Sequence, residues 1–215
     1  MTVRSRDVAG NWSAQSTALN VTTSAGGGTP TTVTFQDGVS GYAGTTDATI
    51  ASASATSNFG TNALLEVDGD PDQSALLRFD LATIPSSATV TTVTLTFNIT
   101  NGSDSAYQIF ALKQAFAEGS TTWNLAQTGV NGQTAGANGA NDRETTSLGA
   151  TPTGTGELSV TLNAAGLAKV QSWVSNPATN FGFIIMDAVN TNGADLRSSE
   201  TGTATQRPKI SVTYQ

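Results

Sequence analysis

Alternation of apolar and polar residues with a period of two is the feature that most restricts what this chain can fold into. The clearest run is residues 88–100, where Val93, Leu95, Phe97 and Ile99 alternate with Thr92, Thr94, Thr96 and Asn98. Residues 74–81 alternate in the same way, with apolar side chains at positions 75, 77, 79 and 81. A period of two sends successive side chains to opposite faces of a β-strand, so both runs are predicted to be strands.

The second of these strands is expected to form a hairpin with residues 63–67 across the acidic turn of residues 68–72. Leu65 and Val67 are the apolar set of the partner strand. For both apolar sets to share one face of one sheet, the loop between paired positions must hold an odd number of residues. The predicted members of the common core are Leu77, Phe79, Leu95, Phe97, Ile184 and Val212.

Short strand patterns recur through the rest of the chain, and only one helical pattern interrupts them. The strand patterns cover residues 33–35, 47–52, 107–116, 158–162, 181–186, 194–198 and 210–214. The helix is expected after Asn163, which can cap it, and before Asn176-Pro177. Residues 119–156 are rich in Gly, Asn and Thr and are predicted to be a long loop. The sequence therefore predicts an all-β protein, a jelly-roll-like antiparallel β-sandwich with one short helix.

Three segments are expected along the chain. Residues 33–215 carry the sandwich pattern, and residues 24–32 form a Gly-rich linker. Residues 1–23 hold two strand patterns around the turn DVAGN, and they resemble the C-terminal hairpin of a fibronectin type III domain. Tail, linker and sandwich together are typical of a modular extracellular protein. We therefore expect a monomeric module within a larger multidomain chain.

The composition excludes several classes of function. The 215 residues include no cysteine and no histidine, which removes disulfides, thiolate metal sites and the commonest general base. A net charge of −7 argues against binding to nucleic acid or to anionic membranes. No apolar run approaches the roughly 18 residues of a membrane-spanning helix, so no membrane insertion is expected. Charged residues make up 12%, and the abundance of Ser, Thr, Gly, Ala and Asn is typical of a secreted or cell-surface bacterial protein.

Eight short motifs follow one another in an order that resembles a known family. They are GYAGTTDATI (41–50), NFGTNALLEVD (58–68), LLRFDLATIP (76–85), ATVTTVTLTF (88–97), EGSTTWN (118–124), VQSWVSNPATNFGFII (170–185), LRSSE (196–200) and RPKISVTY (207–214). Together they resemble the DNRLRE domain, a β-sandwich family classed among the carbohydrate-binding modules and found beside polysaccharide lyases, glycosidases and surface proteins. The resemblance covers residues 34–214 and implies polysaccharide binding, with alginate as a ligand associated with the family. The family's Ser-Arg-Glu motif is displaced here to residues 197–200, Arg-Ser-Ser-Glu.

Aromatic side chains are the first candidates for sugar contacts, because sugar rings stack on exposed aromatic faces. Tyr42 lies in a Gly-rich loop and is a candidate platform. Trp123 lies beside the long loop and is either a platform or a structural anchor. Trp173 is expected to fill the space between the helix and a sheet.

Cationic side chains would be needed to bind an acidic polymer. The candidates are Arg78, Arg143 and Arg197. Arg78 has a competing explanation, because an internal ion pair with the nearby Asp80 would also account for it.

Three alternating carboxylates, Asp68, Asp70 and Asp72, have the spacing that begins many calcium loops. They do not begin an EF-hand, because that pattern requires glycine at its sixth position and glutamate at its twelfth, where this chain has glutamine and phenylalanine. A structural Ca²⁺ bound by these three residues is one hypothesis, and a solvated acidic turn is the other. Asp37 and Asp47 are the next candidates for a calcium site.

These observations favour a non-catalytic carbohydrate-binding module that anchors a modular extracellular protein or enzyme to a polysaccharide, with an acidic polymer such as alginate as a candidate. One alternative is a structural or adhesion spacer of a cell-surface protein. The other is a polysaccharide-degrading enzyme, for which the sixteen Asp and Glu residues could supply a carboxylate pair although no motif marks one.

Overall fold

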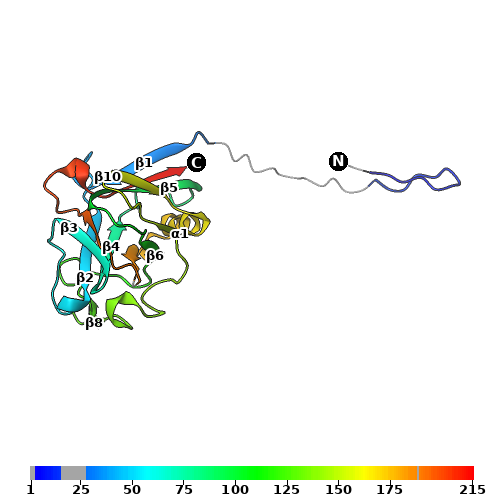
Figure 1. Cartoon of the computed structure of the whole chain (residues 1–215). Helices are drawn as coiled ribbons and strands as arrows, with labels where there is room; N and C mark the ends of the chain where they lie inside the picture. Colours follow the sequence, from blue (N-terminus) through cyan, green and yellow to red (C-terminus); the bar gives the residue numbers. More distant parts are fainter. Residues whose placement is uncertain (1–2, 16–27, 188) are drawn as a thin grey trace.

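Two layers of antiparallel strands form the body of the molecule (Figure 1), in a computed structural model that describes residues 3–15, 28–187 and 189–215. Its strands are β1 (Thr31–Gln36), β2 (Thr45–Ala51), β3 (Leu64–Gly69), β4 (Asp72–Phe79), β5 (Val90–Asn101), β6 (Gln108–Ala111), β7 (Leu125–Gln127), β8 (Val130–Asn131), β9 (Gly149–Ala150), β10 (Gly156–Thr161), β11 (Phe183–Met186), β12 (Ala194–Arg197) and β13 (Lys209–Tyr214). Within the described residues, α1 (Ala164–Ser175) is the α-helix. The expected all-β sandwich with one short helix is confirmed.

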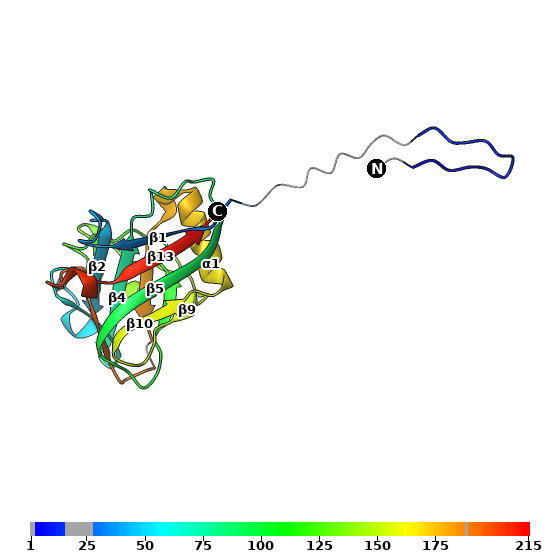
Figure 2. The ribbon, with the colours of Figure 1, turned by 90° about the horizontal axis from the view of Figure 1, so that it is seen from above.

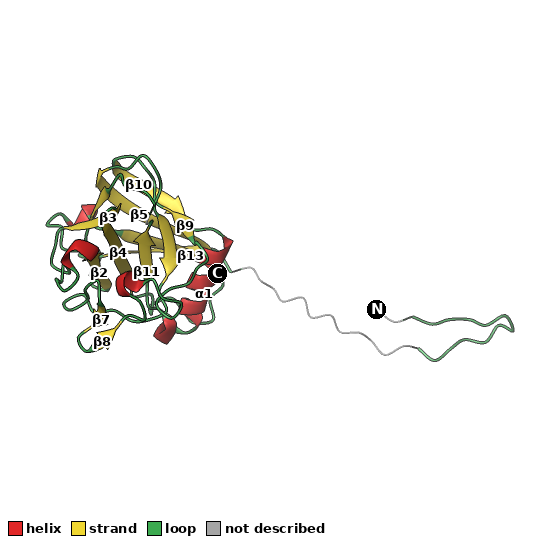
Figure 3. Cartoon of the chain, turned by 60° about the horizontal axis from the view of Figure 1, so that its bottom comes forward, coloured by secondary structure: helices red, strands yellow, loops and turns green. Residues whose placement is uncertain are grey.

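The first layer has the strand order β1-β13-β5-β12-β3, and β10 pairs with the other side of β5. Figure 2 shows β1, β13, β5 and β10 side by side. The second layer has the order β4-β11-β6-β9, and β2 pairs with the other side of β4. Its central strands β4 and β11 are visible in Figure 3. The strand β3 joins the layers, because it pairs with β12 in the first and with the start of β4 in the second.

The ends of the sandwich lie together. In the ladder between β1 and β13, Thr31 at the start of the sandwich pairs with Tyr214 near its end. Gln215 is held by two backbone hydrogen bonds with Thr89, of 2.8 and 3.0 Å. The chain therefore enters and leaves the sandwich at the same end of the first layer.

Alternation in β5 places its apolar set in the core between the layers. Leu95 and Phe97 are at most 1% exposed, whereas Thr92 on the opposite face is exposed. The main core also takes in Leu77, Phe79 and Val212, as expected. Each of these side chains removes its apolar surface from water, which is the dominant favourable contribution to folding.

The hairpin of β3 and β4 differs from the expectation. Asp68 pairs with Gln73 and Gly69 with Asp72, so the turn is the two-residue pair Asp70-Pro71 and not an odd-numbered loop. Continued along the strands, this register would place Val67 opposite Ser74. The apolar residues of β3 would then face the other side of the sheet from the apolar residues at positions 75, 77 and 79 of β4. Both sets nevertheless reach the main core, because β3 leaves β4 after two pairs and continues in the opposite layer.

The strand β4 is buried on both faces, because a second apolar cluster lies outside the second layer. Its buried members are Ile50, Leu76, Leu112, Ile184 and Met186, with Phe110, Phe116, Trp123, Ala137 and Phe181 packed against them. Residues 113–145 cover this face, and we call the cluster the outer core. Ile184 belongs to it and not to the main core, so that prediction is wrong. All four residues of β11 are buried, so no exposed residue distinguishes one face of this strand from the other.

The helix α1 closes one end of the sandwich, where it packs against β5. Asn163 caps it as expected, since its Oδ1 accepts a hydrogen bond from Gly166 N at 3.0 Å. Trp173 is 2% exposed and its ring meets that of Phe183 edge to face at 4.9 Å. The prediction that Trp173 fills the space between helix and sheet agrees with this packing. Among the described residues, no helix is both long and apolar enough to span a membrane.

Residues 3–15 form a separate hairpin. Arg6 pairs with Trp12, and the Arg6 guanidinium lies 5.5 Å from the centre of the indole ring. Trp12 is 61% exposed and Val8 is fully exposed. Residues 1–2 and 16–23 of the expected tail and residues 24–27 of the expected linker lie outside the described residues. The division of the chain into tail, linker and sandwich stays a prediction, as does the fibronectin-like origin of the tail.

Candidate functional site

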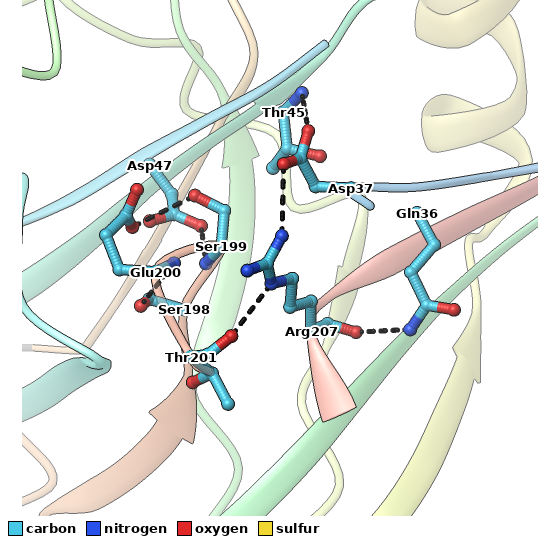
Figure 4. A network of polar contacts seen from close by, with 9 residues as sticks. All are labelled: Gln36, Asp37, Thr45, Asp47, Ser198, Ser199, Glu200, Thr201 and Arg207. Atoms are coloured by element: carbon cyan, nitrogen blue, oxygen red, sulfur yellow. Dashed lines mark hydrogen bonds and ion pairs between the residues drawn. The ribbon is translucent and has the colours of Figure 1, made fainter. Parts of the chain in front are cut away.

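Three carboxylates converge at the open edge of the second layer, and we call them the acidic cluster. Asp47 comes from β2 and Glu200 from the loop after β12. Glu118 comes from residues 113–145, which cover the outer core and which we call the covering loop. One carboxylate oxygen from each lies within 4.8 Å of the others. Figure 4 shows Asp47 and Glu200 pointing toward one another beside the Ser198–Thr201 loop.

Each of these three carboxylates accepts a hydrogen bond from within the site. Asp47 Oδ2 accepts a hydrogen bond from Ser199 N at 2.8 Å. Glu118 Oε1 accepts one from Asp47 N, also at 2.8 Å. The Ser199 hydroxyl donates to Glu200 Oε2 at 3.0 Å. The cluster is therefore organised by the backbone of one strand and one loop, which need not move to bring the oxygens together.

Burial and mutual repulsion make the charged state of the cluster costly. Asp47 is 1% exposed, and burial raises the pKa of its carboxyl well above the ordinary value, with the charges of Glu200 and Glu118 adding to the effect. Burial also raises the pKa of Glu118. Three negative charges this close repel strongly in a partly dry site. Either protons or a cation must offset that repulsion.

Motifs far apart in the sequence meet at this cluster. Asn58, from the NFG motif, donates through Nδ2 to Glu118 O at 2.6 Å and to Thr121 O at 2.8 Å. Gly60 lies so close to Glu118 O that a Cβ atom there would clash with it. Arg207 forms an ion pair with Asp37 at 3.3 Å and donates to Thr201 O at 2.8 Å, which ties the Glu200 loop to the start of the Tyr42 loop (Figure 4).

The donor set of the acidic cluster suits a hard cation. Its ligands are carboxylate oxygens with a serine hydroxyl beside them, and the chain has neither histidine nor cysteine for a softer metal. Oxygen-rich sites of this kind fit Ca²⁺ by ligand type. Of the two further calcium candidates from the sequence, Asp47 belongs to the acidic cluster, whereas Asp37 forms an ion pair with Arg207.

The three aspartates whose spacing first suggested a calcium site lie elsewhere. Asp68 is the second-last residue of β3, Asp70 is in the turn, and Asp72 begins β4. Asp68 Oδ1 accepts hydrogen bonds from Gly69 N and Asp70 N, as in an ordinary turn. Within the described residues, these three do not form a converging group like the acidic cluster. The calcium hypothesis for them stays a prediction.

Tyr42 lines an open groove beside β1, which we call the Tyr42 groove. The hollow measures about 450 Å³ and is lined by Val33, Thr34, Phe35, residues 39–44, Asp80 and Thr83. The tyrosine hydroxyl donates to Asp80 O at 3.2 Å, and its ring meets that of Phe35 edge to face at 5.3 Å. Burial raises the pKa of Tyr42 to about 12, so the phenol is neutral at any physiological pH.

Trp123 is part of the structure of the covering loop. Its ring packs against the outer core, and a Cβ atom on Gly136 would lie 2.5 Å from it. The Trp123 carbonyl also accepts a hydrogen bond from Gly136 N at 2.7 Å. Glycine is required at this position, because φ is +76° and the indole leaves no room for a side chain. These contacts favour the structural anchor over the platform.

Two of the three candidate arginines lie along one row of the second layer. Gly182 lies opposite Arg78, since Phe183 pairs with Leu77, and Leu112 N donates to Gly182 O at 2.9 Å. Leu112 in turn forms a bridge with Arg143. Arg197 is at the end of β12 in the first layer, and its buried Nε has no hydrogen-bond partner in the part of the chain that the structure describes. Arg78 has no carboxylate within salt-bridge distance among the described residues, so the expected ion pair with Asp80 is absent there.

The arginine row leads to a groove with lysines that the sequence reading missed. The hollow is lined by Leu112, Lys113, Glu144, Lys169, Ser172, Trp173, Thr179 and Phe181, with Arg143 adjacent, and we call it the basic groove. Lys169 pairs with Glu144 at 3.3 Å, and Lys113 Nζ donates to Ala140 O at 2.7 Å. The Arg143 guanidinium lies 4.6 Å from the centre of the Phe110 ring. Arg78, Lys113, Arg143 and Lys169 are four of the seven lysines and arginines in residues 28–215.

A two-layer β-sandwich with open grooves on its surface is compatible with the sugar-binding role that the sequence predicts. Comparison with protein families agrees: residues 39–214 match the model of carbohydrate-binding module family 96. The chain therefore belongs to carbohydrate-binding module family 96. No curated protein sequence matches it significantly. The finer resemblance to the DNRLRE domain stays a prediction.

Proposed function

We propose that this chain is a non-catalytic module that anchors a secreted or cell-surface bacterial protein to an extracellular polysaccharide. The observation that carries the proposal is the family match across residues 39–214. The Gly-rich segment before the sandwich and the separate hairpin of residues 3–15 support a place within a longer modular protein. In that protein the module supplies attachment as a monomer, and a neighbouring domain supplies any chemistry.

We infer further that the basic groove binds an acidic polysaccharide such as alginate. The protein as a whole carries a charge of −7, yet two lysines, Lys113 and Lys169, line this groove, and Glu144, the partner of Lys169, is the one carboxylate among its lining residues. Lys113 is exposed, and its ammonium group has further protons for a ligand carboxylate beyond the one given to Ala140 O. Phe181, which is half-buried, supplies apolar surface against which a sugar ring can lie.

Affinity electrophoresis through gels that contain alginate, pectate or neutral polymers tests this function. The double variant Lys113→Gln/Lys169→Gln should weaken alginate retardation roughly threefold to thirtyfold, and added salt should weaken it further. Lys209→Gln is the matched control, because this lysine lies in the first layer, paired with Glu157 at 3.0 Å. A double variant that binds as well as wild type would contradict the groove assignment. A wild-type protein that no polysaccharide retards would favour the spacer alternative.

We also propose a structural Ca²⁺ at the acidic cluster. Asp47, Glu118 and Glu200 would bind it through carboxylate oxygens, and it would supply the positive charge that offsets their repulsion. Such an ion would tie β2, the covering loop and the Ser198–Thr201 loop together. Its role would be stability and not catalysis.

The acidic cluster is also the feature that an enzyme hypothesis would use, because a glycosidase needs two carboxylates with different pKa values. Asp47 is 1% exposed, however, and its Oδ2 already accepts a hydrogen bond from Ser199 N. A sugar chain cannot reach the enclosed Asp47 carboxyl, so a glycosidase pair that includes Asp47 is disfavoured. Incubation with each polysaccharide, followed by assays for reducing ends and unsaturated products, should therefore show no reaction.

A further inference from the structure

The Tyr42 groove differs from the basic groove in charge. None of its lining residues is a lysine or arginine. Asp80 is exposed at its wall, and no cation lies within salt-bridge distance of it among the described residues. A ligand carboxylate would be repelled at this surface, whereas sugar hydroxyls would not.

We propose that the Tyr42 groove is a second saccharide site, which takes a neutral sugar ring. The inference rests on the proposed function, since it gives the same module a second site with a different ligand class. A hollow of about 450 Å³ falls within the usual range for small-ligand sites, roughly 300–1,000 Å³. The groove combines one aromatic face, one carboxylate and several hydroxyl groups, which is the chemistry that neutral sugars require.

The aromatic ring is fixed before any ligand arrives. The Tyr42 hydroxyl donates to Asp80 O, and its ring edge packs against Phe35 at an interplanar angle of 61°. A ring that is already immobilised loses little entropy on binding, so more of the stacking energy appears as affinity.

The carboxylate of Asp80 has one oxygen to spare. Its Oδ1 accepts a hydrogen bond from Ala82 N at 2.9 Å, and Oδ2 accepts none from the described residues. An ionised carboxylate oxygen is a strong acceptor for sugar hydroxyls.

The small residues of the wall keep this arrangement open. A Cβ atom on Gly44 would lie 2.9 Å from both Asp80 Cβ and the Tyr42 hydroxyl oxygen. Gly41 has φ of +78°, a conformation that favours glycine, with nothing nearby to fill the space. The loop therefore turns sharply around the tyrosine and leaves its ring at the groove.

The test is affinity electrophoresis with hydroxyethylcellulose, galactomannan and glucomannan as neutral probes and alginate as the acidic probe. Wild type should be retarded by at least one neutral polymer, with no loss at high salt. Tyr42→Ala should lower that affinity at least tenfold, and Asp80→Asn should lower it less. Thr83→Trp, at an exposed wall position, should block the groove without disturbing the core, which guards against a Tyr42→Ala protein that fails to fold.

The outcomes separate the two proposals. If alginate retards the protein and no neutral polymer does, the inference is overturned while the proposed function stands. If a neutral polymer is bound equally by wild type and by Thr83→Trp, the sugar lies elsewhere and the inference also fails. If Thr83→Trp loses the neutral polymer but keeps alginate, the two sites are separate. If no polymer retards the wild type, both proposals fail.

Discussion

The outer face of the first layer is hydroxylated and wet, whereas the outer face of the second layer is apolar and covered. In the first, Thr34 and Ser211 pair through hydroxyls at 2.8 Å, as do Thr32 and Thr213. In the second, Leu76 and Ile184 pack beneath residues 113–145. The covering loop, residues 113–145, contains the candidate binding residues Lys113 and Arg143. It also contains Glu118, which we propose as a calcium ligand. The proposed basic groove and the proposed calcium site therefore both lie on the layer that is covered, whereas the Tyr42 groove lies beside β1 of the first layer.

Removing a ring from the main core should have the largest effect on stability. Phe79→Ala is expected to lower the free energy of unfolding by about 3–5 kcal/mol, because Phe79 is 2% exposed and the cavity cannot collapse between two sheets. Denaturant melts measure the loss. A loss below about 1 kcal/mol would mean that Phe79 does not face the main core.

Truncation of Leu76, on the opposite face of the same strand, tests whether the outer core stabilises the fold as the main core does. Leu76→Ala should cost about 2–4 kcal/mol, comparable with a main-core leucine, because Leu76 is 3% exposed. Hydrogen exchange should accelerate in residues 113–145 before it does in β5. Uniform acceleration throughout the sandwich would show that the two cores do not unfold separately.

Calcium should raise the melting temperature by roughly 5–10 °C at one hundred times its dissociation constant, since binding to the folded state alone adds about 2.7 kcal/mol. Magnesium and a chelator are the comparison samples. Identical melting curves in all three would contradict the proposed ion. A shift that persists in Asp47→Asn would move it elsewhere, with Asp68, Asp70 and Asp72 as the next candidates.

The Asp47 carboxyl also predicts how the stability of the protein depends on pH when no metal is bound. The pKa of Asp47 is raised in the folded state, so above its unfolded value near 3.8 the folded protein holds the extra proton. Stability should therefore fall as pH rises from about 4 through the folded-state pKa. Chelated samples melted across this range should show the fall, and Asp47→Asn should flatten it.

Changes on the wet face should have the smallest effect. Thr34→Val removes one hydroxyl of an exposed pair and keeps the shape of the side chain. The free energy of unfolding should change by less than about 0.5 kcal/mol. A larger loss in denaturant melts would show that the hydroxyl pairs contribute to stability as the covered face does.

The wet face is also the reason why β5 could be predicted from sequence. Its threonines mark one side as solvent-facing, so the alternation identifies the core side without ambiguity. The strand β11 offers no such mark, because all four of its residues are buried, and Ile184 was assigned to the wrong core. The parity rule failed at the β3–β4 hairpin because it assumes that paired strands stay in one sheet, and β3 crosses to the other.

The candidate sites could be predicted only in part, because they combine distant segments. Asp47 meets Glu118 and Glu200 across 71 and 153 positions of sequence, and no local spacing encodes that meeting. The motifs GYAGTTDATI, EGSTTWN and LRSSE each contain one of the three carboxylates, and this shared feature was the available signal. Lys113 and Lys169 were missed because only the packing of α1 beside the end of β6 brings them together.

The pairing of β1 with β13 determines how the sandwich responds to a pulling force. Because Thr31 and Tyr214 are partners, the two ends of the module lie side by side. Tension applied through both ends would open the β1–β13 ladder one hydrogen-bonded pair at a time, like a zipper, and would not shear all its bonds at once. The module also adds almost no length to a chain in which it sits, so it would hang from that chain as a side branch, a poor shape for a spacer.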